Sequence, residues 1–214
     1  MVVGTALALL PGCQMWPFGT KERTSLITPA MRVATIQELG PRSKRASSEE
    51  QLATCQQLAS QIMTEPDPIV RKAIQETLAE FDHPFAADVL KAGLNDEDRG
   101  VRLVCCRMLA RRGDASAVPL LAHAARNDRD VDVRLAAVEA LGALKTPDSV
   151  RAVAEALRDR DPAMQYAGVQ AMREATGKDL GNDVEIWRQY ASTLEGGEAA
   201  ASVAAQPTDG AATR

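Results

Sequence analysis

Apolar residues recur at helical spacing in four stretches of the chain, and the four stretches begin alike. Each opens with Asp, places an apolar residue three positions later, and places a second apolar residue eight positions after the first. An interval of eight returns to the same face of an α-helix, so each stretch predicts an amphipathic helix. The fifth residue of the opening recurs at intervals of 31, 32 and 31 residues. The openings are residues 67–71, 98–102, 130–134 and 161–165, with a looser copy at 28–32.

The apolar stripe has the same three columns in the successive copies. Gln75 interrupts the middle column of one copy, and the neighbouring Ile74 can take its place. Burial of each Val or Leu stabilises the fold by ~1.5–3 kcal/mol, so every such helix needs a neighbour that covers its stripe. The columns are Met31, Val70, Val101, Val133 and Met164; Ile36, Cys106, Val138 and Val169; and Leu39, Leu78, Leu109, Leu141 and Met172.

A second helix is predicted after each of these first helices. Asp or Thr at the opening is a good N-cap, and Pro, where it follows, suits the first helical turn. Turn-forming residues then separate the two helices of a pair at 82–84, 112–114 and 145–147. In the first copy, Ser47 and Glu50 have the spacing of a capping box. The apolar positions of the second helices are Leu52, Leu58 and Ile62; Ala87, Leu90 and Leu94; Val118, Leu121 and Ala125; and Val150, Val153 and Leu157.

Composition narrows the fold class to all-α. Hydrophobic residues make up 45% of the chain and aromatic residues only 3%, so the core must be built from Ala, Val and Leu. Strands usually contain more aromatic and β-branched residues. Repeated helix pairs that cover one another predict an α-solenoid of about five pairs over residues 28–194. Trp187 is predicted to pack in a short helix that closes the stack, and residues 195–214 are expected to be disordered.

Helix pairs of this period that open with Asp-x-x-Val-Arg resemble HEAT repeats, and most of all the short bacterial kind known as PBS-lyase HEAT-like repeats. The resemblance covers residues 28 to about 175 and rests on repeated columns. It implies that the recurring Asp and Arg form polar contacts between neighbouring repeats. Arg71, Arg102 and Arg134 are therefore expected to be structural, and Gln165 departs from the pattern where the stack ends.

The amino-terminal residues suggest a lipid anchor. An apolar run at residues 2–10 is too short to span a bilayer and leads into Leu10-Pro11-Gly12-Cys13, which resembles a bacterial lipobox. Residues 1–13 would then be a signal segment, Cys13 the lipid attachment site and residues 14–27 a tether. Pro11 is unusual at its position, and no Lys or Arg precedes the apolar run. The alternative is an apolar tail with an incidental cysteine.

No residue pattern predicts a catalytic, metal or cofactor site. The four cysteines and two histidines do not have the spacing of a zinc site, and no glycine-rich phosphate loop or nucleophile motif occurs. Cys105 and Cys106 fall in the apolar stripe of a helix, which favours buried structural thiols. A net charge of −4 argues against a dedicated nucleic-acid binder.

These observations favour a non-catalytic scaffold that binds another protein and is tethered to the bacterial cell envelope by a lipid anchor. The second helices of solenoids usually line the concave, binding face. Two alternatives remain: a relative or subunit of a bilin-lyase-type enzyme, because those families share the repeats, and a HEAT-like nucleic-acid binder. The candidate partner-binding residues on the second helices are Lys91, His123, Arg126, Arg151, Glu155 and Arg158, with Asp88 beside them.

Overall fold

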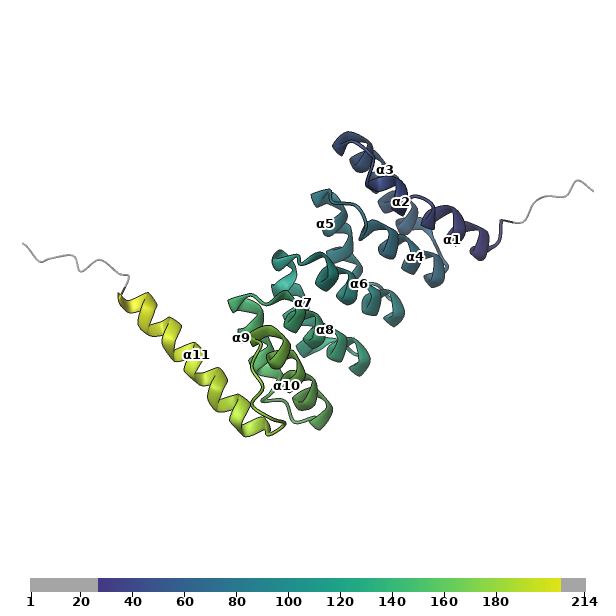
Figure 1. Ribbon diagram of the computed structural model, residues 1–214. Helices are drawn as coiled ribbons and strands as arrows, with labels where there is room; N and C mark the ends of the chain where they lie inside the picture. The colour runs from purple at the N-terminus through teal and green to yellow at the C-terminus, as the bar shows by residue number, and fades with distance from the viewer. Residues whose placement is uncertain (1–26, 205–214) are drawn as a thin grey trace, which may run out of the picture.

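The computed structural model describes residues 27–204, and the side chains of these residues as far as Leu194. The chain forms two parallel rows of helices (Figure 1). The first-helix row contains α1 (Pro29–Gln37), α4 (Pro68–Leu78), α6 (Arg99–Arg112), α8 (Val131–Leu144) and α10 (Pro162–Thr176). The second-helix row contains α3 (Ser48–Thr64), α5 (Pro84–Gly93), α7 (Val118–Asn127) and α9 (Pro147–Ala156), and α11 (Val184–Ala204) follows α10. A short helix, α2 (Gly40–Ser43), and a 3₁₀ turn, η1 (Ala115–Ala117), lie in two of the connections.

Each first helix packs on the first helix of the next repeat, from α1 through α4, α6 and α8 to α10. The described residues contain no strand. The predicted all-α solenoid is therefore confirmed. The signal segment 1–13, Cys13, the tether as far as residue 26 and residues 205–214 lie outside the described part of the chain. No helix within that part is long and apolar enough to cross a bilayer.

The helix starts follow the predicted capping pattern. The side chains of Asp67 and Asp98 accept hydrogen bonds from backbone N–H groups at 2.8 Å and 3.1 Å, in the first turns of α4 and α6. Asp130 and Asp161 do the same for α8 and α10, at 3.0 Å and 2.9 Å. The Ser47–Glu50 capping box at the start of α3 is also present. These caps satisfy N–H groups that have no partner within their own helices.

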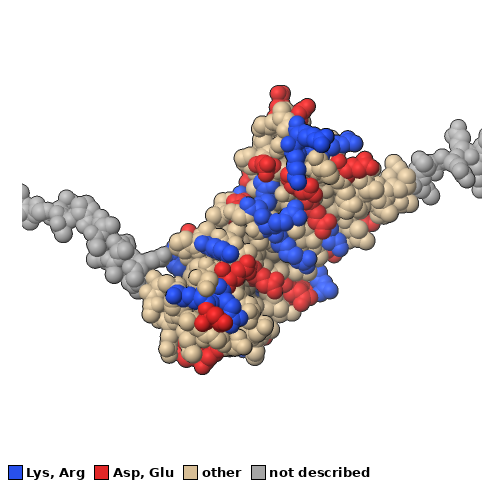
Figure 2. All heavy atoms as spheres, in the orientation of Figure 1, with Lys and Arg blue, Asp and Glu red and all other residues tan. Residues whose placement is uncertain are grey.

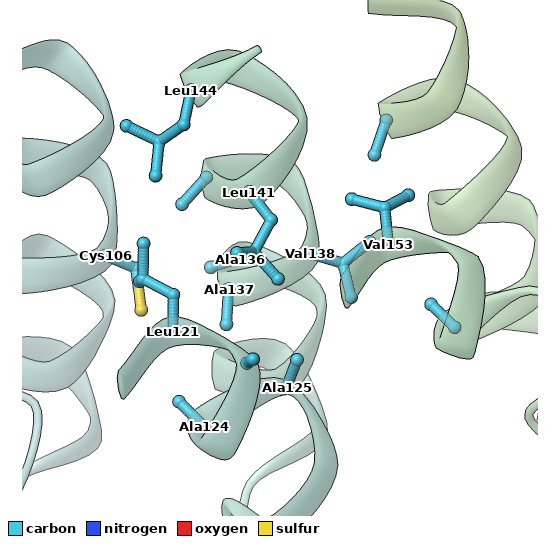
Figure 3. Packing of buried hydrophobic residues seen from close by; sticks show 14 of the residues in the cluster. Cys106, Leu121, Ala124, Ala125, Ala136, Ala137, Val138, Leu141, Leu144 and Val153 are labelled. Carbon is cyan, nitrogen blue, oxygen red and sulfur yellow. The ribbon is translucent and has the colours of Figure 1, made fainter. Parts of the chain in front are cut away.

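The predicted apolar columns form the core between the two rows. Leu78, Leu109, Leu141 and Met172 are all fully buried. In the middle of the stack, side chains from α6, α7, α8 and α9 interlock around Leu141 (Figure 3). The small residues of the core allow close contact: a Cβ on Gly142 would lie 2.7 Å from the Ala171 Cα, so α8 and α10 meet backbone to backbone.

Met31 does not occupy the buried position predicted for it. Its side chain is 52% exposed, whereas its counterparts Val70, Val101 and Val133 are fully buried. Met31 lies in α1, the first helix of the described row, and α4 covers α1 on one side only. In the next repeat Ile74 is fully buried beside the buried Gln75, so the expected compensation by Ile74 is confirmed.

The carboxyl-terminal end of the stack is closed by α11. Trp187 is fully buried, and its indole N–H donates a hydrogen bond of 2.8 Å to the Gly181 carbonyl. Arg188 donates to the Leu157 carbonyl at 2.8 Å, which attaches α11 to the end of α9. The predicted packing role of Trp187 is confirmed. The helix continues to Ala204, beyond residue 194, where the sequence placed the end of the folded region.

Candidate functional site

Arginines link successive repeats along one edge of the stack. The Arg71 guanidinium donates two hydrogen bonds of 2.9 Å to Asp96, in the connection that leads to the next repeat. Arg102 donates in the same way to Asp128, at 2.7 Å and 2.9 Å. Each arginine also donates to a backbone carbonyl six residues earlier, in the connection that follows the preceding second helix. We call these contacts the arginine ladder.

Arg32 donates to Glu65 in the same way, at 3.1 Å and 2.9 Å, whereas two other members of the ladder make only part of these contacts. Arg134 donates to the Asp128 carbonyl at 3.0 Å, and Gln165 donates to the Asp159 carbonyl at 2.7 Å. The backbone bond is thus retained even where glutamine replaces arginine. The structural role expected for Arg71, Arg102 and Arg134 is confirmed by these bonds.

The acidic partners in the ladder are not the aspartates that recur at the helix starts. Asp96 and Asp128 lie two residues before the capping residues Asp98 and Asp130, and they accept the N–H groups of those residues at 2.8 Å and 2.9 Å. Burial raises the pKa of Asp128, but hydrogen bonds from Arg102 and from the Asp130 N–H outweigh burial, so its pKa is lowered overall. Its carboxylate is therefore ionised near neutral pH in the folded protein.

Two adjoining hollows open between successive second helices. The first lies between α3 and α5, has a volume of about 410 Å³ and is lined mostly by apolar side chains, including Ile62, Met63 and Val89. The second, called the α5/α7 hollow, lies between α7 and the connection that follows α5, has a volume of about 370 Å³ and includes His123 and Arg129. Asn95 and Asp96 line both hollows, so the two meet at the end of α5. Together they cross three second helices.

The six residues chosen as candidate partner contacts lie along the second-helix row. Lys91 is in α5, His123 and Arg126 are in α7, Arg151 and Glu155 are in α9, and Arg158 lies two residues after the end of α9. Arg126 and Glu155 form an ion pair of 2.7 Å between α7 and α9, and both side chains are about half exposed. Arg151 pairs with Asp148 within α9. The ring of His123 lies 3.2 Å from the amide of Asn127 and lines the α5/α7 hollow.

Lys91 is more constrained than its helical position suggested. Its ammonium group lies 2.9 Å from Asp88, 3.1 Å from the Ser116 hydroxyl and 3.8 Å from Asp114. The side chain is only 19% exposed. These contacts tie α5 to the loop before α7, so Lys91 supports the packing of the row more directly than it faces a partner.

The family sequence model for HEAT repeats matches two overlapping stretches of the chain, residues 55–141 and residues 88–173. Together they span more than half of the chain. The chain belongs to the HEAT-repeat family. The two matched stretches cover α4 to α9 and most of α10, and thus the central members of both rows. No curated protein matches the chain.

Within the described HEAT repeats, no three His, Cys, Asp or Glu side chains are close enough together to hold a metal ion. Cys55, Cys105 and Cys106 are fully buried free thiols. Burial raises the pKa of Cys55 to about 11 and that of Cys106 to about 12, and raises the pKa of Cys105 well above its usual value. Thiolates are the reactive form of cysteine, so these thiols are unreactive near neutral pH. The expectation of buried structural cysteines is confirmed.

Thiol labelling of the Cys13→Ser variant checks this interpretation. That variant retains three cysteines, Cys55, Cys105 and Cys106. We expect no rapid reaction with a disulfide reagent at pH 8 in the folded state, and reaction of all three thiols after unfolding in guanidinium chloride, because burial disfavours the thiolate. A thiol that reacts within seconds in the folded protein would contradict the assignment.

Apart from His123 and Asp88, the residues that line the two hollows were not selected from the sequence as candidate partner contacts. Met63 is 83% exposed and Leu120 is 40% exposed, although both are large apolar residues. Exposed apolar side chains that surround a hollow are typical of a binding surface. A signal was present in the sequence, since residues 51–64 contain no charged residue, which is unusual for a helix that faces solvent on one side.

Proposed function

We propose that this HEAT-repeat protein is a non-catalytic scaffold that binds a segment of another protein along the second-helix row. HEAT repeats generally mediate protein–protein interactions. The observation that carries the proposal is the pair of adjoining hollows across α3, α5 and α7. An extended or helical segment laid over these hollows would cover Met63 and Leu120, whose exposure costs free energy in the unbound protein.

The charge distribution supports a protein partner over a nucleic acid. Basic and acidic side chains are interspersed over the visible face (Figure 2). Several of the exposed basic residues are paired with carboxylates, as in the contact of 3.2 Å between Arg99 and Asp132. Proteins that bind a phosphate backbone usually present a continuous basic surface that displaces counterions. A surface of mixed charge is therefore poorly suited to single-stranded or double-stranded nucleic acid.

We further propose that a lipid on Cys13 attaches the scaffold to the cell envelope. The order of an apolar run, a small residue and a cysteine in residues 2–13 supports this attachment. In that arrangement, the tether at residues 14–27 would connect the membrane to α1. The repeats would then hold their partner within a tether length of the membrane surface.

Site-specific photo-crosslinking in cells tests where the partner binds. A photoreactive amino acid is placed at Ala92 or Leu120, which are exposed on the second-helix row, and at Glu76 or Glu139, which are exposed on the first-helix row. We expect Ala92 and Leu120 to crosslink to the same protein and the two control positions to give no such product. Crosslinks from Glu76 and Glu139 alone would reject the second-helix row as the binding surface.

The lipid anchor is tested in the same cells. We expect the protein to fractionate with membranes, with its mature amino terminus at a lipid-modified Cys13, and the Cys13→Ser variant to leave the membrane fraction. The opposite outcome is that neither the unaltered protein nor Cys13→Ser is found with membranes and that both crosslink to the same soluble enzyme. The lipid anchor would then be wrong, and a role as an enzyme subunit would be favoured.

A further inference from the structure

The hollow between α3 and α5 has a distinct apolar character. Its lining includes Ala59, Ile62 and Met63 from α3 and Val89 and Ala92 from α5. Met63 is the most exposed large hydrophobic residue in the described part of the chain, at 83%. Nothing on α3 from residue 51 to residue 64 carries a charge. This part of the second-helix row therefore suits an apolar side chain of the partner.

The polar groups that line this hollow are acidic or can accept hydrogen bonds. Asp88 lies on the rim with 68% of its side chain exposed. Asp96 lies at the end where the two hollows meet and is already paired with Arg71 at 2.9 Å, so Asp88 is the carboxylate that can receive a cation. No Lys or Arg lines the hollow. Lys91 approaches Asp88 to 2.9 Å but also contacts Ser116 and Asp114 on the side of α7, away from α3. The rim therefore favours a cationic group.

Gln75 supplies a second, independent observation. Its side chain is 1% exposed and lines the hollow from α4. Its Oε1 is buried and accepts no hydrogen bond from the described residues. An unpaired buried acceptor carries a free-energy cost that a donor on a bound segment would remove. The Gln75 Oε1 is therefore an acceptor for which a bound segment can supply the donor.

The neighbouring hollow between α5 and α7 has a different charge. Arg102, Arg129 and His123 line it together with Asp96, Glu97 and Asp128, and Arg102 is already bonded to Asp128. A segment that crosses both hollows therefore meets an apolar site with acidic side chains first and a site of mixed charge next. Only the first has carboxylates and no Lys or Arg in its lining.

We propose that the α3/α5 hollow binds an apolar side chain of the partner that is flanked by Lys or Arg. The inference rests on the proposed scaffold function and specifies the chemistry of the bound segment. The apolar side chain packs against Ile62, Met63 and Val89, the flanking cation pairs with Asp88, and an N–H of the segment donates to the Gln75 carboxamide.

Selection from a phage library of short random peptides, with the full-length chain as bait, tests this inference. We expect enrichment of peptides in which an aliphatic or Met residue is adjacent to Lys or Arg. The affinity of one enriched peptide is then measured by fluorescence anisotropy. Asp88→Lys is expected to weaken that peptide about tenfold, because it places like charges at the rim, and Met63→Ser about threefold or more, because apolar contact is lost.

Glu139→Lys is the matched control, because it makes the same change of charge at an exposed position of the first-helix row. It is expected to leave the affinity within a factor of two, given the screening of distant exposed charges. A selection repeated on Asp88→Lys should favour acidic flanks instead. Thermal unfolding of each variant establishes that it is folded.

Three results would overturn the inference: no enriched peptide, enrichment of acidic flanks on the unaltered protein, or an affinity unchanged by Asp88→Lys. The scaffold function is judged separately by the crosslinks from Ala92 and Leu120. If those crosslinks form while the peptide chemistry differs, the second-helix row binds a partner and only the assignment of the α3/α5 hollow is wrong.

Discussion

Replacing Arg102 with Met is expected to lower the free energy of unfolding by about 3–5 kcal/mol, the range for breaking a buried ion pair from one side. The side chains of Arg102 and Asp128 are only 4% and 8% exposed, and they are joined by bonds of 2.7 Å and 2.9 Å. The variant leaves the Asp128 carboxylate buried without its cation. It also removes the donor to the Asp96 carbonyl, a bond of 2.8 Å. Urea unfolding followed by circular dichroism measures the change.

Arg99→Met is the matched control for this prediction. Arg99 lies three residues earlier in the same helix and contacts Asp132 at 3.2 Å, but its side chain is 63% exposed. Solvent-exposed ion pairs contribute roughly 0–1 kcal/mol, so little change is expected. Equal effects of the two substitutions would show that burial does not set the strength of the arginine ladder.

The pH dependence of stability provides a further check on the same pair. The pKa of Asp128 is lowered in the folded state, so the unfolded chain binds a proton at a higher pH than the folded one. The stabilisation is therefore fully present above the pKa of the unfolded state and is lost as pH falls through the folded pKa. Below neutral pH, the unfolding free energy of Arg102→Met should decrease less steeply than that of the unaltered protein.

Trp187→Ala is expected to cost about 3–5 kcal/mol, as large-to-small changes at buried aromatic positions do. Trp187 is fully buried, its ring meets Tyr190 edge to face with centroids 6.0 Å apart, and its N–H is bonded to Gly181. Because neighbouring repeats support one another in a linear array, loss of this closing residue should unfold the carboxyl-terminal repeats first. Hydrogen exchange of α9 and α10 amides should show the effect.

Two controls separate the roles of Trp187. Trp187→Phe keeps most of the packing and removes the hydrogen bond to Gly181, so it should cost less than Trp187→Ala. Tyr166→Ala removes an aromatic ring that is 61% exposed on the same end of the stack, and it should change stability by about 0.5 kcal/mol or less. If Tyr166→Ala were as damaging as Trp187→Ala, α11 would not be the element that closes the stack.

The arginine ladder and the closing helix α11 both stabilise repeats that have no complete core of their own. A HEAT repeat has no complete core of its own, because its apolar stripe is covered by the next repeat. Arg71 and Arg102 set the position of one repeat on the next, and Trp187 covers the apolar end that has no further repeat beyond it. Contacts between successive repeats therefore set the spacing of the hollows in the second-helix row.

Local rules in the sequence determined the helices and most of the core. An Asp at the cap position and apolar residues eight positions apart specify where α4, α6, α8 and α10 begin and which face is buried, since both signals act within one helix. The same reasoning correctly placed the buried cysteines and Trp187. It also placed His123, Arg126 and Glu155 on the second helices, where the structure has them.

Contacts between helices decided which apolar faces are covered, which carboxylates the arginines bind and where the hollows lie. Periodicity shows that Met31 is on an apolar face but not whether a helix covers that face, and in the structure none covers Met31 completely. The acceptors of the arginine ladder are Asp96 and Asp128, two residues from the recurring caps, because the loops of successive repeats bring those carboxylates to the guanidinium groups. The hollows depend on the distance between α3, α5 and α7. A sequence pattern specifies the faces of each helix, whereas the spacing between helices is set by the volumes of all side chains packed between them.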